Sequence, residues 1–241
     1  MTRSSPAVPP PSADLVEELV IGNRIIFDQK IVDAFGHISV RHDKDPGKYL
    51  LARNRAPGLV TADDIVIFDL DSNPLGDVSG EYYSERFIHG EIYKARSDVV
   101  AVIHCHAPQL IPFGVTSRPL RPIYHMSGFL GAGAPVFEIR DAGGMTDMLI
   151  RTAGLGKALA DSLADKPLVL MRGHGATMVG GSIKQVVYRA IYAALNAALQ
   201  MEALRLGEVT FLDPAEAAQT AATNDKAIER PWALWKRQAM G

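Results

Sequence analysis

The chain has 241 residues, of which 47% are hydrophobic and 22% are charged, and its formal net charge is −2. These values are typical of a globular protein, and the lack of a dense lysine and arginine block argues against nucleic acid or a membrane surface as the main partner. A single cysteine, Cys105, excludes an internal disulfide and fits a cytoplasmic location. No apolar run reaches the ~18 residues of a membrane-spanning helix, and we expect no secretory signal.

The chain divides into a proline-rich N-terminal tail over residues 1–12, expected to be flexible, and a single domain over residues 13–241. Ser12 is suited to capping a helix, and apolar residues at helical spacing predict a helix over 13–34. The further predicted strands are 37–41, 49–52, 65–69, 99–103, 136–139 and 168–171, and the further predicted helices are 84–96, 155–163 and 182–206. A polar, alanine-rich C-terminal tail follows Gly207. These elements predict an α/β fold with helices covering a largely antiparallel sheet.

Two histidines, His104 and His106, flank Cys105 at the end of the predicted strand 99–103. Residues two apart on a strand point to the same face, so both imidazoles can reach one point while the cysteine faces away. On a helix the same pair would diverge by about 200°. The spacing therefore indicates a metal chelate, with a pair of polar surface histidines as the alternative.

His174 and Glu85 are the other candidate metal residues. His174 lies between two glycines directly after the apolar strand 168–171, where the backbone can turn sharply and leave the imidazole accessible. Glu85 opens the predicted helix 84–96 and can serve as a fourth ligand or as a general acid/base. The alternatives are a turn histidine without a role and a solvated glutamate in a first helical turn. Three imidazoles facing one cavity would suit Zn, Mn, Fe or Co.

Four segments in chain order resemble those of a known family: Ser84-Glu85, His89-Gly90-Glu91-Ile92-Tyr93, Ala101-Val102-Ile103-His104-Cys105-His106-Ala107-Pro108 and Arg172-Gly173-His174-Gly175. In this order the chain resembles the class II aldolase/adducin family, over roughly residues 14–205. The resemblance implies a three-layer αβα fold with a central, mostly antiparallel sheet, and assembly into a homotetramer.

The resemblance also implies one divalent metal ion per subunit, with Mn²⁺ favoured and Zn²⁺ as the alternative. Residues that match His104, His106 and His174 bind the metal in this family. The residue that matches Glu85 is the catalytic acid/base and in some members a ligand. Adducin-type members lack the metal histidines, so a non-catalytic interaction module is the weakest of the alternatives.

The chain departs from the sugar-phosphate members of the family where those enzymes hold phosphate. His37 stands where an asparagine is expected, and Ser84 is the one remaining serine of a pair. The departures favour a branch that decarboxylates ortho-hydroxy aromatic dicarboxylates. We expect 3-hydroxy-2-methylpyridine-4,5-dicarboxylate, of vitamin B6 degradation, as the substrate, with dihydroxyphthalates as neighbours. The alternative is an aldolase or epimerase that acts on a sugar phosphate or hydroxy-keto acid.

Several residues are candidates for holding a carboxylate substrate, besides His37 and Ser84. Arg53 and Arg55 share a face of an extended segment, and a guanidinium matches a carboxylate in shape, although two solvated arginines are the alternative. Tyr124 and His125 form a polar pair in a later loop, where His125 is a candidate proton donor or a loop histidine without function. Aromatic residues that can wall a flat ring, or pack in the core, are Phe35, Tyr82 and Tyr83.

Overall fold

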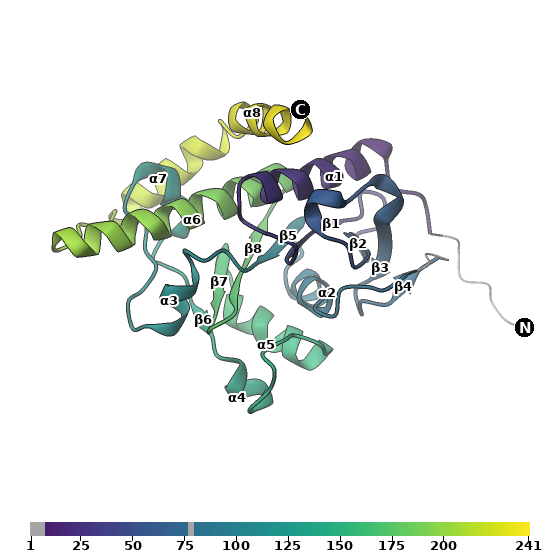
Figure 1. Ribbon diagram of the computed structural model, residues 1–241, viewed down its shortest axis with the longest axis horizontal. Coiled ribbons are helices and arrows are strands. Elements are labelled where there is room, and N and C mark those ends of the chain that lie inside the picture. The colour runs from purple at the N-terminus through teal and green to yellow at the C-terminus, as the bar shows by residue number, and fades with distance from the viewer. Residues whose placement is uncertain (1–7, 77–79) are drawn as a thin grey trace, which may run out of the picture.

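The computed structural model describes residues 8–76 and 80–241, and one sheet of eight strands runs through them (Figure 1). The strands are β1 (His37–Arg41), β2 (Lys48–Ala52), β3 (Ile65–Asp69), β4 (Pro74–Leu75), β5 (Ala101–Cys105), β6 (Val136–Phe137), β7 (Leu168–Met171) and β8 (Gly175–Gly180). Their order across the sheet is β4-β3-β2-β1-β5-β8-β7-β6. Every neighbouring pair is antiparallel except β6 and β7, which are parallel. The predicted mostly antiparallel sheet is confirmed.

Helices cover both faces of the sheet and give the three layers that the family resemblance implies. The α-helices are α1 (Ala13–Asp28), α2 (Phe87–Ala95), α3 (Ile111–Val115), α4 (Ile139–Gly143), α5 (Ala153–Leu163), α6 (Ile183–Leu206), α7 (Pro214–Asp225) and α8 (Glu229–Met240). Short 3₁₀ helices are η1 (Pro57–Leu59), η2 (Ala62–Asp64) and η3 (His125–Leu130). Figure 1 shows α1, α6 and α8 on one side of the sheet and α2 and α5 on the other. The predicted α/β fold class is confirmed.

The central strand β5 separates two buried hydrophobic clusters. Ile103 and Cys105 belong to the cluster under α1 and α6, whereas Val102 belongs to the cluster under α2 and α5. Because side chains alternate along a strand, His104 faces the same side as Val102. The strand therefore directs the first predicted metal ligand toward α2 and turns the cysteine away, as predicted.

Several predicted element boundaries differ from the structure: the helix predicted over 84–96 is Phe87–Ala95, and the strand predicted over 136–139 is Val136–Phe137. The first helix ends at Asp28 rather than near residue 34, because Lys30 adopts a left-handed backbone with φ of 59° and the N–H of Ile31 returns to the carbonyl of Ile26. Strand β5 extends through His104 and Cys105, whereas the prediction ended it at residue 103. Pairing with β1 and β8 on both sides supplies hydrogen bonds that an apolar pattern does not reveal.

The C-terminal segment, predicted as a polar tail, is helical. Asp213 and Glu216 form a reciprocal capping box at the start of α7. Trp232 and Trp235 of α8 are buried in the cluster under α1 and α6. Burying these two large rings holds α8 against the domain.

The predicted N-terminal tail falls partly outside the described residues, which begin at residue 8. Within the described part, the carbonyls of Pro9 and Pro10 accept hydrogen bonds from His42 and Lys44. None of the helices in residues 8–76 and 80–241 combines the length and apolar character needed to cross a membrane.

Gly175 at the start of β8 lies against the backbone of Cys105 and His106, so its replacement tests the sheet beside the histidines. A methyl group at this position would lie 2.1 Å from the Cys105 carbonyl oxygen. We expect Gly175→Ala to lower the free energy of unfolding by about 2 kcal/mol or more, as measured by urea denaturation. Gly181→Ala is the control, since its methyl group would meet no atom nearer than Gln185 Oε1 at 3.5 Å. Equal stability of the two variants would contradict this account of the close approach.

Candidate metal centre

The sheet brings His104, His106 and His174 together through the pairing of β5 with β8. His104 is opposite Thr177 and Cys105 is opposite Ala176 in this ladder. His174 occupies the tight turn that joins β7 to β8, and Gly173 before it has a φ of 64°, which favours glycine. The turn therefore places His174 beside the end of β5, although 68 residues separate it from His106.

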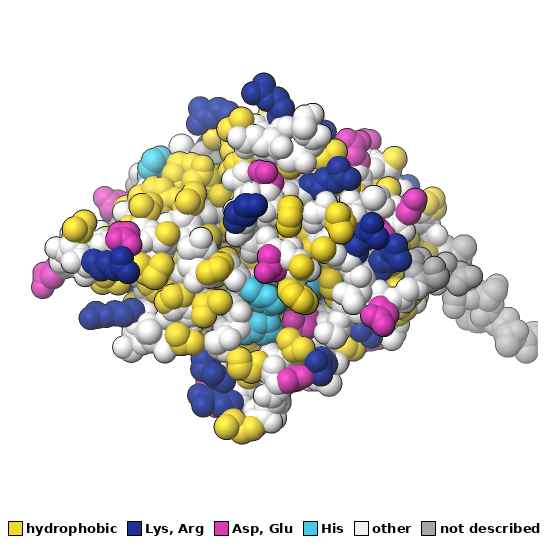
Figure 2. Space-filling model, in the orientation of Figure 1, with side chains coloured by type: hydrophobic (Ala, Val, Ile, Leu, Met, Phe, Trp, Pro, Cys, Tyr) yellow, Lys and Arg dark blue, Asp and Glu magenta, His cyan; other side chains and the backbone are white. Residues whose placement is uncertain are grey.

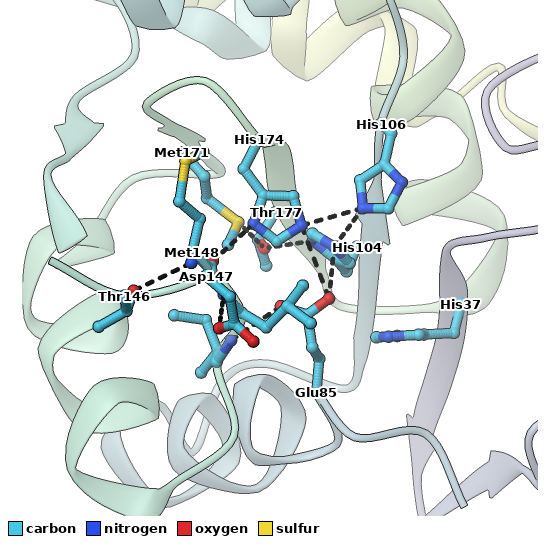
Figure 3. A network of polar contacts seen from close by, with 12 residues as sticks. His37, Glu85, His104, His106, Thr146, Asp147, Met148, Met171, His174 and Thr177 are labelled. Carbon is cyan, nitrogen blue, oxygen red and sulfur yellow. Dashed lines mark hydrogen bonds and ion pairs between the residues drawn. The ribbon is translucent and has the colours of Figure 1, made fainter. Parts of the chain in front are cut away.

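Nitrogen atoms of the three imidazoles converge on one point together with a Glu85 oxygen. His106 Nε2 lies 3.1 Å from His104 Nε2 and 3.0 Å from His174 Nε2. Glu85 Oε2 lies 3.5 Å from His104 Nε2 and 3.6 Å from His174 Nε2. The four ligand atoms lie within 4.8 Å of one another, and Figure 3 shows the side chains turned toward one another. The structure thus brings together all four residues predicted to hold the metal.

Hydrogen bonds behind two of the rings leave their Nε2 lone pairs free. His174 Nδ1 donates to the Met148 carbonyl at 3.0 Å, so Nε2 of this neutral ring carries no hydrogen. Thr177 Oγ1 donates to Met171 Sδ and lies 3.4 Å from His104 Nδ1, which can donate to it. Such contacts orient metal-binding histidines and select the tautomer.

The donor set fits a divalent cation. His104 and His174 both direct lone pairs toward His106 Nε2, which can give a hydrogen to only one of them at a time. Burial, with the neighbouring His104 and His174 side chains, lowers the pKa of His106 to about 4. His106 is therefore neutral at neutral pH and has no second hydrogen to place between the imidazole nitrogens. A cation at the convergence point would satisfy the lone pairs, and three imidazoles with a carboxylate suit Zn²⁺ or Mn²⁺.

Glu85 is held in the turn that precedes α2, with its side chain buried against the histidines. The backbone N–H of Ile150 donates to Oε1 at 2.9 Å, which directs Oε2 toward the imidazoles. Burial raises the pKa of Glu85, but His104, His174 and the Ile150 N–H outweigh it and lower the pKa to about 2. The carboxylate is therefore ionised at neutral pH, as a metal ligand or a general base must be.

A cavity of about 270 Å³ opens beside Glu85 and His106. His37 and Tyr83 form buried parts of its wall, Ser84 also lines it, and Phe35, which is 68% exposed, lies at its margin. Figure 2 shows histidine side chains reaching the surface on this face, beside an acidic side chain. The lining includes two of the predicted substrate residues, His37 and Ser84, and no lysine or arginine among the residues that the structure describes.

The predicted carboxylate clamp, Arg53 and Arg55, lies outside this lining. Arg53 Nε donates to Asp64 Oδ1 at 2.6 Å, and Arg55 Nε lies 3.2 Å from Asp64 Oδ2. Both guanidinium groups are therefore ordered by Asp64, a buried carboxylate that needs a cationic partner. The spacing of the two arginines in the sequence does not reveal this contact. Their contact with a substrate carboxylate stays a prediction.

Tyr124 and His125 are not brought to the metal residues within one chain. His125 begins η3 and lines another cavity, of about 380 Å³, with Tyr188 and Tyr192 of α6. Its backbone carbonyl accepts a hydrogen bond from Asn224 at the end of α7. The role of His125 as a proton donor stays a prediction.

The segment before α5 contributes contacts that the sequence did not indicate. Met148 supplies the carbonyl that orients His174, and Ile150 supplies the N–H that holds Glu85. Met148 has a φ of 69°, an uncommon conformation for a residue other than glycine. Backbone groups act here, so the residue types carry no signal of the role.

Comparison with known proteins places the chain in a family. Residues 17–201 match the model of the Class II Aldolase and Adducin N-terminal domain, and the chain belongs to this family. The predicted family resemblance is therefore confirmed.

Several relatives have decarboxylase names. Decarboxylase tropJ of Talaromyces stipitatus is 36% identical over 252 residues, covering 95% of each chain. The 3,4-dihydroxyphthalate decarboxylase of Arthrobacter keyseri is 30% identical over 206 residues, covering 79% of each chain. Among solved structures, an aldolase II superfamily protein from Pseudomonas syringae has a TM-score of 0.79 at 22% identity, covering 96% of this chain and 94% of that chain. This structural likeness supports the fold.

Metal content tests the assignment of the four ligand atoms. We expect the purified wild-type protein, after incubation with Mn²⁺ or Zn²⁺ and gel filtration, to retain one ion per chain by elemental mass spectrometry. His106→Ala should lose most of it, because His106 Nε2 lies close to both other imidazole nitrogens. Glu85→Gln should keep most of it, since three imidazoles remain. His125→Gln, in the other cavity, is the control, and equal metal loss in it and in His106→Ala would refute the site.

Buried neutral imidazoles make the metal-free protein sensitive to acid. Burial, with His89 and the three ligand histidines nearby, holds the pKa of His37 well below its usual value, and burial with nearby His104 lowers the pKa of His89 to about 3. The unfolded chain binds these protons first, near pH 6.5, so the stability present above that pH is lost as the pH falls toward the folded pKa values.

We therefore expect the free energy of unfolding of the metal-free protein to fall by roughly 2 kcal/mol per pH unit below pH 6, since each histidine contributes up to about 1.4. Urea denaturation at pH 7.5, 6.0, 5.5 and 5.0 measures this slope. His37→Asn should make the slope shallower. A stability that does not change over this range would show that the two imidazoles are not buried in the neutral form.

Proposed function

We propose that the protein is a metal-dependent decarboxylase of an aromatic acid that carries a hydroxyl group ortho to the departing carboxylate. The observation that carries the proposal is the convergence of three imidazole nitrogens and the Glu85 carboxylate beside a small cavity. The volume of about 270 Å³ lies just below the usual range of roughly 300–1,000 Å³ for small-molecule sites, which suits a one-ring acid. Relatives named as decarboxylases support the reaction class.

The walls of the cavity favour a flat acid over a sugar phosphate. Tyr83 and the exposed ring of Phe35 offer aromatic faces to a ring. A phosphate site usually presents lysine, arginine or a helix N-terminus, and the described lining has no lysine or arginine. We propose 3,4-dihydroxyphthalate and 3-hydroxy-2-methylpyridine-4,5-dicarboxylate as the two substrates to compare, because both contain the ortho-hydroxy acid.

Glu85 can move the proton that the reaction needs. With Oε1 held by Ile150, ionised Oε2 can take the proton of the substrate hydroxyl. The phenolate electron pair then flows into the ring, and Glu85 returns the proton to the carbon that bears the carboxylate. As the carbon–carbon bond breaks, its electron pair restores the aromatic ring and CO₂ leaves. Water reprotonates the phenolate product, which balances the proton taken by the ring carbon.

His104, His106 and His174 would hold the ion, with Glu85 at its edge. A bound divalent ion supplies Lewis acidity, which stabilises negative charge on substrate oxygens. We propose Mn²⁺, with Zn²⁺ as the alternative, and a homotetramer as the assembly.

CO₂ release tests the proposed reaction. We expect chelator-treated protein to release little CO₂ from either substrate, and Mn²⁺ or Zn²⁺ to restore release from at least one. Phthalate, which has the carboxylates but no hydroxyl, is the matched control and should give no CO₂. Release that is equally fast without metal would disprove metal dependence. Cleavage of L-fuculose 1-phosphate without CO₂ release from any acid would establish the aldolase alternative instead.

Glu85→Gln separates proton transfer from metal binding. We expect kcat to fall by about 10²–10⁴ while the metal content stays near that of the wild type, because a placed acid/base contributes about this much. Single-turnover CO₂ release with saturating substrate measures the effect. Wild-type turnover in this variant would remove Glu85 from the chemistry.

A further inference from the structure

A chain of buried hydrogen bonds runs from the wall of the cavity into the core between β1 and α2. His37 Nδ1 lies 2.6 Å from His89 Nε2, and His89 Nδ1 lies 2.6 Å from Ser39 Oγ. Ser39 Oγ lies 2.8 Å from the hydroxyl of Tyr93, which reaches the Val100 carbonyl at 3.3 Å. All four side chains are buried. The proposed mechanism uses none of these groups, although the chain ends beside the metal residues.

The chemistry of the partners sets the direction of the hydrogens. Ser39 has one hydrogen and two neighbours, and an imidazole nitrogen is a better acceptor than a phenol oxygen, so Ser39 donates to His89 Nδ1. Tyr93 then donates to Ser39 at 2.8 Å rather than to the more distant Val100 carbonyl, which already accepts from the Arg41 N–H at 2.7 Å. His89, with Nδ1 accepting, carries its hydrogen on Nε2.

The same logic determines the tautomer of His37. His89 Nε2 donates to His37 Nδ1, so the hydrogen of the neutral His37 ring is on Nε2. His37 lines the cavity, and Nε2 has no hydrogen-bond partner among the described residues. Figure 3 shows His37 extending from its strand toward Glu85 and His104. Its ring centre lies 5.2 Å from that of His104, so a ligand beside the metal residues would be within reach of this N–H.

We propose that Tyr93, Ser39 and His89 are positioning residues that hold His37 in the Nε2–H tautomer, so that His37 donates a hydrogen bond to an anionic oxygen of the aromatic acid. The inference rests on the proposed function, because the ligand is the substrate or product of that reaction. It identifies a specificity determinant: the cavity offers this fixed donor to an anion where lysine and arginine are absent from its described lining.

The hydrogen bonds behind His37 matter because a free imidazole exchanges its hydrogen between its two nitrogens. With the hydrogen on Nδ1, His37 would direct a lone pair at the ligand and repel an anionic oxygen. Three consecutive donors behind the ring remove that state. Two of these residues act without touching His37: one hydrogen bond joins His89 to His37, whereas three successive hydrogen bonds join Tyr93 to it.

Nuclear magnetic resonance on the Zn²⁺-loaded protein tests the tautomer without any turnover. Two-bond ¹H–¹⁵N spectra of histidine-labelled protein distinguish Nε2–H from Nδ1–H, and His37→Asn assigns the signal. We expect wild-type His37 to show the Nε2–H form alone, and Ser39→Ala to show both forms. A wild-type His37 that carries its hydrogen on Nδ1 would overturn the proposal, whatever the enzyme turns over.

Binding of 3,4-dihydroxybenzoate, a one-ring hydroxy acid, tests the consequence by calorimetry on the same Zn²⁺-loaded protein. We expect Tyr93→Phe to weaken binding by about threefold to tenfold, the usual effect of one hydrogen bond. Tyr49→Phe is the matched control, because Tyr49 is also buried and its hydroxyl bonds to Ser72 at 3.0 Å, outside the hydrogen bonds that lead to His37. It should leave the affinity unchanged. Equal weakening in both variants would indicate a general structural effect and overturn the proposal.

A double-mutant cycle shows whether the chain acts through His37. A side-chain amide at position 37 needs no tautomer to offer an N–H, so adding Ser39→Ala to His37→Gln should not weaken 3,4-dihydroxybenzoate binding further. Additive losses would refute transmission through His37. If the acid binds with these effects but neither proposed substrate yields CO₂, the proposed function fails while the positioning chain stands.

Discussion

The constraint on which this structure depends is the close approach of His104 Nε2 and His174 Nε2 to His106 Nε2, at 3.1 and 3.0 Å. Nitrogen lone pairs at this separation repel unless a hydrogen or a cation lies between them, and the hydrogen bonds from Nδ1 of His174 and His104 leave too few hydrogens for the purpose. The fold therefore maintains an arrangement that is unfavourable alone and becomes favourable with a metal ion. Burial of Glu85 beside the rings adds a negative charge on the same side.

The sheet provides the rigidity that such a site needs. Strand β5 lies between β1 and β8, so His104 is paired in register with His37 on one side and Thr177 on the other, and the turn between β7 and β8 delivers His174 to the same end. The segment that contains Met148 and Ile150 then fixes one histidine and the glutamate from a single short stretch. Ligands on strands with supporting contacts from a loop combine accurate placement with access to solvent on one side.

Sequence patterns predicted the features that depend on a few neighbouring residues, such as strand positions and the two histidines at the end of β5. Alternation along a strand was enough to place His104 and His106 together, and apolar runs located β1, β3 and β7 within a residue of their observed bounds. Strand β8 and helix α7 escaped prediction, because a short strand bounded by glycines and an alanine-rich helix lack a clear apolar period. The pairing of Arg53 and Arg55 with Asp64, and the backbone contacts of Met148 and Ile150, are tertiary facts with no sequence signature.

The position of His37 links the fold to the choice of substrate. A histidine on β1 opposite His104 can be neutral and still a directed donor only if something behind it fixes the hydrogen, and α2 supplies His89 for this purpose one turn before Tyr93. A donor without net charge can bind one carboxylate or phenolate oxygen but does little to offset the charge of a phosphate. In the proposed function, the aromatic wall and the uncharged donor suit a planar carboxylate, whereas a sugar phosphate would find no lysine or arginine in the described lining.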